Sequence, residues 1–289
     1  MFEKKARFVG CSDDEKNADI IVAGIPYDMT STYRKGSDLG PGALREMSES
    51  IESFSPRQFS DITDFNICDI GDLEIQGIEP EKAVKEIENA AQYIIESGKK
   101  GVFIGGEHLV SYPIVKKYAE KYPDLKVLYF DAHADMRDDY DGCRLSHAAA
   151  ARRIFESAGE KALYMFGIRS FEKNEMMFIR DNMIPCDTEL VEIDSAVQAV
   201  KNSPVYISID MDVFDPSEVP GVGNPEAGGI TYRGFMKVIS ELENIKNIVG
   251  FDIVELSPKY DPSGASSAFA AKIMREMLLM LADGEDLEL

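Results

Sequence analysis

Histidine is scarce in this chain, and its three copies lie in one short stretch. The 289 residues include only His108, His133 and His147. Each lies in an acidic or glycine-rich motif: Gly-Gly-Glu-His at 105–108, Asp-Ala-His-Ala-Asp at 131–135 and Ser-His-Ala at 146–148. Histidines with no common role would be scattered over the surface, so this clustering indicates one shared site.

Basic residues are also few, with 31 Lys and Arg against 52 Asp and Glu and a net charge of −21. This balance argues against nucleic acid as a partner, because phosphate binding requires clustered Lys and Arg. An acidic surface can steer a cationic substrate toward a site. Solubility is the simpler explanation of the same charge.

Closely spaced cysteines and long apolar runs are absent. The four cysteines are far apart and no pair has CxxC spacing, which excludes a zinc knuckle or a redox motif of that type. The N-terminus has no apolar signal segment, and no apolar run approaches the roughly 20 residues needed to cross a bilayer. The sequence therefore predicts a cytoplasmic protein that does not enter the membrane.

Short apolar runs alternate with amphipathic helical patterns along almost the whole chain. Such runs are typical of strands buried on both faces, and their alternation with helices predicts a mostly parallel sheet covered on both sides. No linker or repeat interrupts the pattern, which predicts one catalytic domain over 1–289. We expect strands over 20–24, 65–70, 101–104, 127–130, 162–167, 183–186, 205–209 and 247–253, and helices over 80–97, 110–121, 146–157, 188–201, 232–243 and 266–282.

Three polar motifs directly follow the expected strands 101–104, 127–130 and 205–209. In open α/β sheets, ligands bind beyond the carboxyl ends of the strands, so three separate segments can place their side chains at one rim. The side chains concerned are His108, Asp131, His133, Asp135, Asp210 and Asp212.

The spacing within these motifs suits metal binding. In extended backbone, the side chains at positions i, i+2 and i+4 point the same way. Asp131, His133 and Asp135 have this spacing, and Asp210 and Asp212 have its first step. Oxygen-rich ligands with a minority of imidazole favour octahedral Mn²⁺-like sites over structural zinc. An aspartate after a strand can equally be a turn or a helix cap, which explains either aspartate motif alone about as well. All three motifs with two histidines favour a pair of divalent metals.

Two further residues are candidates for chemistry. His147 begins the expected helix 146–157, where it is either a proton shuttle or a helix-terminus histidine with a local partner. Glu255 ends Asp-Ile-Val-Glu at 252–255, after another expected strand. It is either a carboxylate that holds a cationic group of the substrate or a solvated rim carboxylate.

These motifs occur in an order and context that resemble the ureohydrolase (arginase/agmatinase) superfamily. They are Gly-Gly-Glu-His, Asp-Ala-His-Ala-Asp, Ser-Ile-Asp-Met-Asp-Val-Phe-Asp-Pro and Asp-Ile-Val-Glu. The segments 24–28, 40–45 and 220–229 are similar to the agmatinase branch, so the resemblance covers nearly the whole chain. Two departures are Glu107, where Asp is commoner, and Asn224, where Thr is common before proline.

The resemblance implies a three-layer α/β/α sandwich with a mostly parallel eight-stranded sheet, two Mn²⁺ ions and a homo-oligomer, a trimer or a hexamer. Asp131 and Asp210 would bridge the ions. One ion would also take His108 and Asp135, and the other would also take His133 and Asp212.

The implied reaction is hydrolysis of a guanidino compound to urea and an amine, with agmatine giving putrescine, a step of polyamine biosynthesis. Two metals would lower the pKa of a bridging water and hold it as hydroxide. Glu255 would hold the guanidinium, Asp135 would take the remaining proton, and His147 would pass a proton to the leaving amine.

The loop 136–145 indicates which guanidino compound is preferred. It is acidic and lacks the Ser/Asn-bearing pattern with which arginases grip the α-carboxylate of arginine. Asn224 would contact the guanidinium. Asp138 and Asp139, with Glu226, would attract a far ammonium and repel an α-carboxylate, which favours agmatine over arginine. Guanidinobutyrase, formimidoylglutamase and arginase activities, or a catalytically silent regulatory relative, are the alternatives.

Overall fold

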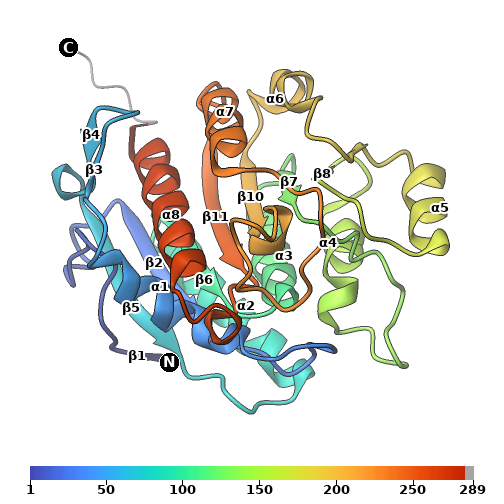
Figure 1. Cartoon of the computed structure of the whole chain (residues 1–289), viewed down its shortest axis with the longest axis horizontal. Helices are drawn as coiled ribbons and strands as arrows, with labels where there is room; N and C mark the ends of the chain where they lie inside the picture. Colours follow the sequence, from blue (N-terminus) through green and yellow to red (C-terminus); the bar gives the residue numbers. More distant parts are fainter. Residues whose placement is uncertain (284–289) are drawn as a thin grey trace.

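A nine-stranded sheet forms the middle layer of the computed structural model, which describes residues 1–283 (Figure 1). Eight neighbouring strands are parallel, and the edge strand β1 pairs antiparallel with β5. A separate two-stranded ribbon pairs β3 (Phe54–Ser55) with β4 (Ser60–Asp61). In spatial order the sheet runs β1 (Phe2–Glu3), β5 (Ile67–Leu73), β2 (Ile20–Ile25), β6 (Lys100–Gly105), β11 (Ile248–Val254), β10 (Val205–Asp210), β7 (Lys126–Phe130), β8 (Leu163–Phe166) and β9 (Cys186–Asp187).

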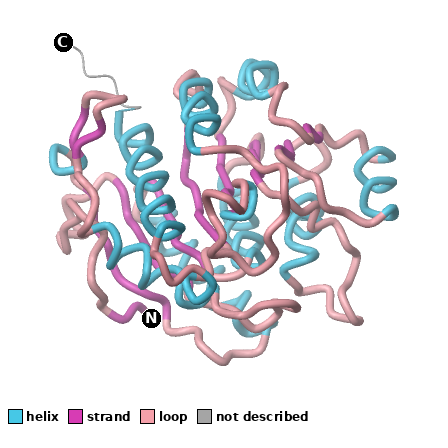
Figure 2. The backbone as a smooth tube through the Cα atoms, viewed as in Figure 1, coloured by secondary structure: helices cyan, strands magenta, loops and turns pink. Residues whose placement is uncertain are grey.

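Helices cover both faces of this sheet. Figure 2 shows them on either side of the strands, with α8 in front of the sheet and α3 behind it in the view of Figure 1. One layer contains α1 (Gly40–Ser48), α6 (Ile193–Val200), α7 (Tyr232–Leu242) and α8 (Ala265–Asp283). The other contains α2 (Pro80–Glu96), α3 (Ser111–Lys121), α4 (Ala150–Ala158) and α5 (Lys173–Asp181).

The strands are apolar on both faces, which is why their sequences read as continuous hydrophobic runs. All six residues of β2 are buried. Ile20 and Val22 belong to the core under α8, whereas Ile21 and Ala23 belong to the core under α2 and α3. Successive side chains therefore fill opposite layers, as the two-residue period of a strand requires.

The expected three-layer sandwich is confirmed, and its eight parallel strands are those implied by the resemblance, with β1 added at the edge. Some helix bounds differ. The helix expected over 188–201 begins only at Ile193, because the Asp187 carboxylate accepts the backbone N–H groups of Glu189 and Glu192 and holds a turn there.

Two helices lie where none was expected. Helix α1 begins inside a segment rich in Gly and Pro, with Pro41 in its first turn, a position that tolerates proline. Helix α5 begins with a capping box in which Glu172 and Glu175 each bind the other's backbone N–H. Among residues 1–283, no helix is long and apolar enough to cross a membrane.

Candidate active site

The six expected ligands lie together at the carboxyl ends of three strands in the middle of the sheet. His108 follows β6, the Asp131–Asp135 motif follows β7, and Asp210 ends β10, just before Asp212. Strand β11, which leads to Glu255, lies between β6 and β10. The motifs therefore meet because their strands are close neighbours, although they lie far apart in the chain.

The Nδ1 atom of His108 is surrounded by carboxylates. It lies 2.9 Å from Asp131 Oδ2, 3.0 Å from Asp210 Oδ2 and 3.6 Å from Asp135 Oδ2. Tyr129 stacks on the imidazole, and its hydroxyl donates to Asp135 Oδ2 over 3.0 Å. His108, Asp131 and Asp135 thus offer one ligand atom each within the reach of a single ion.

A second group of ligand atoms adjoins the first. His133 Nδ1 lies 2.9 Å from Asp212 Oδ2 and 3.6 Å from Asp131 Oδ1. Asp131, His133 and Asp212 form a set that could hold an ion. Because Asp131 belongs to both sets, the two positions are adjacent and share a carboxylate, which is the arrangement expected for a metal pair.

The other nitrogen of each ligand histidine faces an oxygen. His108 Nε2 lies 3.0 Å from Ser208 Oγ, and that hydroxyl donates to Asp252 Oδ1 over 2.7 Å. His133 Nε2 lies 4.0 Å from Glu226 Oε1. An acceptor on this side favours a proton on Nε2 and leaves the Nδ1 lone pair for a metal, so the donor set fits a pair of divalent cations.

The charge balance of the cluster also fits cations. Burial and the neighbouring carboxylates raise the pKa values of Asp135 and Asp210 well above the ordinary range. Burial opposes ionisation of Asp131 too, but hydrogen bonds with His108 and His133 lower its pKa. Although burial disfavours its charged form, the hydrogen bond with Asp131 raises the pKa of His108 to about 9. Divalent ions would balance the neighbouring carboxylates, which are the second cause of the raised pKa values of Asp135 and Asp210.

Two site residues hold unusual backbone conformations. Asp135 has φ 48° and Glu255 has φ 63°, in the left-handed region that non-glycine residues rarely adopt. Such conformations persist only where surrounding contacts impose them, and they gather at functional sites. In Asp135 and Glu255, this backbone conformation directs the carboxylate toward the cavity at the rim of the sheet.

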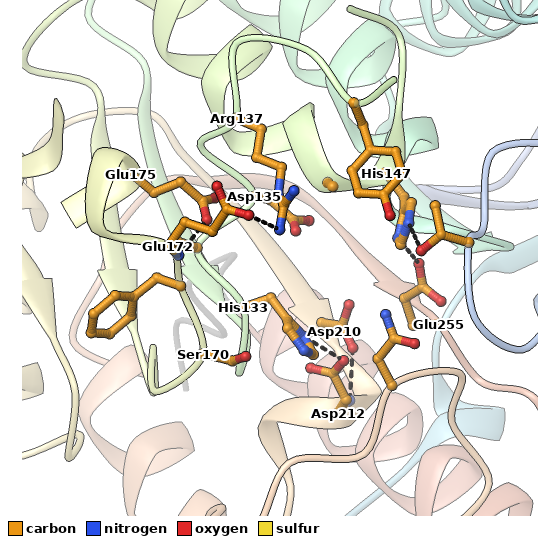
Figure 3. A pocket seen from close by; sticks show the side chains of 16 residues that line it. His133, Asp135, Arg137, His147, Ser170, Glu172, Glu175, Asp210, Asp212 and Glu255 are labelled. Atoms are coloured by element: carbon orange, nitrogen blue, oxygen red, sulfur yellow. Dashed lines mark hydrogen bonds and ion pairs between the residues drawn. The ribbon is translucent and has the colours of Figure 1, made fainter. Parts of the chain in front are cut away.

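A cavity of about 320 Å³ opens over the expected metal ligands (Figure 3). Asp135, Asp210 and Asp212 line its floor together with His133, and Glu255 and His147 face one another on its wall. Asn224 also lines it, so this expected substrate contact lies where a substrate would bind.

His147 is fixed by several partners. Its backbone N–H donates to Thr30 Oγ1 over 2.9 Å, its Nε2 lies 3.3 Å from Thr32 Oγ1, and its Nδ1 lies 3.9 Å from Glu255 Oε1. Burial and the positive charge of His133 lower its pKa to about 4. Both causes favour the uncharged form of the imidazole.

The remaining expected substrate contacts lie outside the cavity lining. Asp138 is exposed, and its Oδ1 binds Arg144 and Arg153. Asp139 is exposed and accepts the backbone N–H of Gly142. Glu226 lies next to His133 and accepts the hydroxyl of Ser170 over 3.0 Å. The structure does not bring Asp138 and Asp139 to the site.

Sequence reasoning missed three charged residues on the far wall of the cavity. Arg137 lines it and pairs with Glu172 over 2.9 Å, and Glu175 lies beside them (Figure 3). Glu175 accepts the backbone N–H groups of Met136 and Glu172 and so joins the loop to α5. The Glu-x-x-Glu spacing at 172–175 was the available signal, since it is compatible with a capping box.

Comparisons with known proteins agree with this geometry. The Arginase family model matches residues 18–280. The agmatinase of Bacillus subtilis (strain 168) is 40% identical over 275 residues, which cover 94% of this chain and 95% of that enzyme. The agmatinase of Pyrococcus horikoshii is 37% identical and covers 93% of this chain and 94% of its own. The solved agmatine ureohydrolase of Thermoplasma volcanium superposes with a TM-score of 0.87 at 30% identity, over 96% of this chain and 94% of that one. The chain belongs to the arginase family, which confirms the resemblance.

Proposed function

We propose that this protein is an agmatinase, which hydrolyses agmatine to urea and putrescine. The observation that carries the proposal is the cluster of six His and Asp side chains at one rim of the sheet, four of which line a cavity together with Glu255 and His147. The curated relatives described above are named agmatinases and match nearly the full chain.

His108, Asp131, His133, Asp135, Asp210 and Asp212 would hold two divalent metals, and their oxygen-rich donor set favours Mn²⁺. When bound, the metals lower the pKa of a water and so supply a nucleophile at neutral pH. Tyr129 donates to Asp135 and orients its carboxylate. That carboxylate is placed to take the proton that the nucleophile loses when it adds to the guanidine carbon.

Glu255 is the residue suited to hold the guanidinium. One of its oxygens, Oε1, accepts the backbone N–H of His108 over 2.8 Å, which fixes the carboxylate at the cavity wall. A carboxylate can bind a planar guanidinium by two parallel N–H bonds. This contact would hold the carbon above the ligands of the metals.

His147 would complete the reaction. The C–N bond to the amine breaks only when the amine nitrogen is protonated. Neutral His147 can accept the proton held at Asp135 and deliver it to that nitrogen, so that the C–N bond breaks to give urea and a neutral amine, which then takes a second proton from water. Its place beside Glu255 keeps the ring near the scissile bond.

The carboxylates that could favour agmatine lie on the far cavity wall and not in the exposed loop. Because Asp138 and Asp139 lie outside the lining, Glu172 is the carboxylate best placed for the far ammonium. Its partner Arg137 gives a specific reason to consider a second candidate. A guanidino acid such as 4-guanidinobutyrate could pair its carboxylate with Arg137.

Urea release from agmatine, arginine and 4-guanidinobutyrate with Mn²⁺ present tests these alternatives. We expect agmatine to exceed arginine at least about a hundredfold in kcat/KM, because like charges would repel the α-carboxylate of arginine. Each factor of ten corresponds to about 1.4 kcal/mol of this repulsion. If 4-guanidinobutyrate is the best substrate, guanidinobutyrase replaces agmatinase. If none of the three releases urea, the proposal fails.

We also propose that the protein works in the cytoplasm as a homo-oligomer, a trimer or a hexamer, on a small cationic substrate. The arginase-family membership supports this assembly. Light scattering of the purified protein gives the mass that decides between a monomer, a trimer and a hexamer.

A further inference from the structure

Glu107 lies between Gly106 and the ligand His108, yet its side chain binds a different part of the molecule. The residue is fully buried. Its Oε2 accepts the backbone N–H of Thr30 over 2.8 Å and the hydroxyl of Ser31 over 3.1 Å, and its Oε1 accepts the Thr30 hydroxyl over 2.8 Å. One carboxylate thus holds two consecutive residues of the loop that follows β2.

The backbone beside Glu107 fits the same loop closely. The Glu107 N–H donates to the carbonyl of Tyr27 over 2.8 Å. A Cβ atom on Gly106 would lie 2.0 Å from that carbonyl oxygen, so only glycine permits the approach. The loop therefore contacts the motif through both its backbone and the Glu107 side chain.

The same loop holds His147. Thr30 Oγ1 accepts the backbone N–H of His147, and Thr32 Oγ1 lies 3.3 Å from the imidazole Nε2. A threonine hydroxyl has a single hydrogen. Because Glu107 accepts that hydrogen, the Thr30 oxygen is oriented with its lone pairs free for the N–H of His147. Three residues from distant segments thus form one directed chain of hydrogen bonds.

We propose that Glu107 is a positioning residue: it orients the Thr30 hydroxyl and the loop around it, and thereby fixes His147 at the cavity wall beside Glu255. The structural part stands without the proposed function, whereas its kinetic consequence rests on that function. It gives a role to Gly106 and Glu107 of the Gly-Gly-Glu-His motif, next to the expected ligand His108.

The position of His147 can be measured without turnover. The chain has only three histidines, so ¹⁵N-histidine NMR of the Mg²⁺-loaded protein gives few ring signals, and the signal lost in His147→Ala is assigned to His147. Glu107→Gln and Thr30→Val should each shift or broaden that signal and leave those of His108 and His133 in place.

A matched control removes a different hydrogen bond from the same loop. Tyr260 donates its hydroxyl to the carbonyl of Lys35 over 2.8 Å, so Tyr260→Phe should leave the His147 signal unchanged. The proposal is overturned if the His147 signal does not move in Glu107→Gln and Thr30→Val. It is overturned too if the His108 signal moves in its place, since Glu107 would then act on a metal ligand.

Kinetics with agmatine and Mn²⁺ provide the second arm. Glu107→Gln and Thr30→Val should each lower kcat about tenfold with KM and metal content unchanged, because only the placement of the proton shuttle suffers. Thr30→Ser keeps the hydroxyl and should retain most of kcat. The double variant should be about as active as the worse single variant, because both changes break one chain of bonds. If the losses of the two single variants multiply in the double variant, the proposal is contradicted.

If the wild-type protein releases no urea from any guanidino compound, the proposed function fails, while the NMR measurement still decides the role of Glu107.

Discussion

Two groups of buried carboxylates lie in this molecule, and their charge is balanced in different ways. In the first, Arg45 of α1 is fully buried against β5. Its Nε and Nη2 bind the two oxygens of Asp69 over 2.8 and 2.9 Å, and its Nη1 binds Asp72. The positive charge that these acids need is therefore part of the chain.

The second group lies at the carboxyl ends of β7 and β10 and contains four aspartates. Within residues 1–283, their ion-pair partners are His108 and His133, whose Nδ1 atoms face the centre of the cluster. Two imidazoles do not balance four carboxylates. A cluster of carboxylates that includes its own arginine stabilises the fold. A cluster that keeps a net negative charge forms a site that bound cations complete.

The same Asp→Asn substitution in each of the two carboxylate groups tests the difference between them most severely. Asp210→Asn should lower kcat/KM at least about a thousandfold, or about 4 kcal/mol, because the variant loses a carboxylate that we propose binds both metals. Metal analysis of the purified variant should show a reduced Mn²⁺ content. Asp69→Asn is the matched control and should retain its metal. Full Mn²⁺ content in Asp210→Asn would remove Asp210 from the ligand set.

Arg45→Met should have the next largest effect, on stability. It leaves Asp69 and Asp72 buried without their cation, and breaking a buried pair in this way costs about 3–5 kcal/mol. Urea unfolding of the metal-free protein measures the change. Under the same conditions Asp210→Asn should not destabilise the protein, since it removes one of several crowded like charges. Equal destabilisation by both variants would contradict the distinction between the two groups.

His147→Ala should lower kcat about a hundredfold while the metal content stays intact, because this residue is offered as a proton shuttle and not as a ligand. Steady-state rates and metal analysis on the same preparation check both parts. A parallel loss of metal would show that the assigned role is wrong. Unchanged activity would leave His147 a helix-terminus histidine with local partners.

The strands and the convergence of the six expected ligands could be predicted because their signals are local. A continuous apolar run followed directly by acidic residues and histidine marks a buried strand and the rim beyond it, as in β7 and Asp131. The cavity wall could not be predicted in this way. Side-chain directions in the loop 136–145 depend on tertiary contacts, such as that of Asp138 with Arg153 of α4. The acids therefore face outward while Arg137 lines the cavity.

The Arg45 group was missed for a related reason. Its partners lie 24 and 27 residues farther along the chain, and nothing local to Arg45 identifies them. Helix α1, which carries Arg45, begins in a segment whose glycines and prolines favour a loop. One catalytic domain over 1–289 stays a prediction, as do the metal-binding, catalytic and substrate-binding roles of the site residues.

A further buried acid, Asp261, differs from both groups, because the hydrogen-bond donors to its carboxylate are neutral. Asp261 precedes α8 and accepts the backbone N–H and the hydroxyl of both Ser263 and Ser266. Burial alone would raise its pKa, but these hydrogen bonds hold it at about 2, below the ordinary 3.8. A depressed folded-state pKa stabilises the fold above the unfolded value, and that contribution is lost as the pH falls through the folded value.

The smallest expected effect follows from that sign. Asp261→Asn should cost about 1 kcal/mol at neutral pH, the difference between charged and neutral hydrogen bonds. The cost should stay constant from pH 8 to pH 5 and shrink below about pH 4, where the wild-type carboxylate becomes protonated in the unfolded state and then in the folded state. Urea unfolding of both proteins between pH 8 and pH 3 measures it. A cost that did not shrink at low pH would mean that the packing of Asp261, and not its charge, stabilises the start of α8.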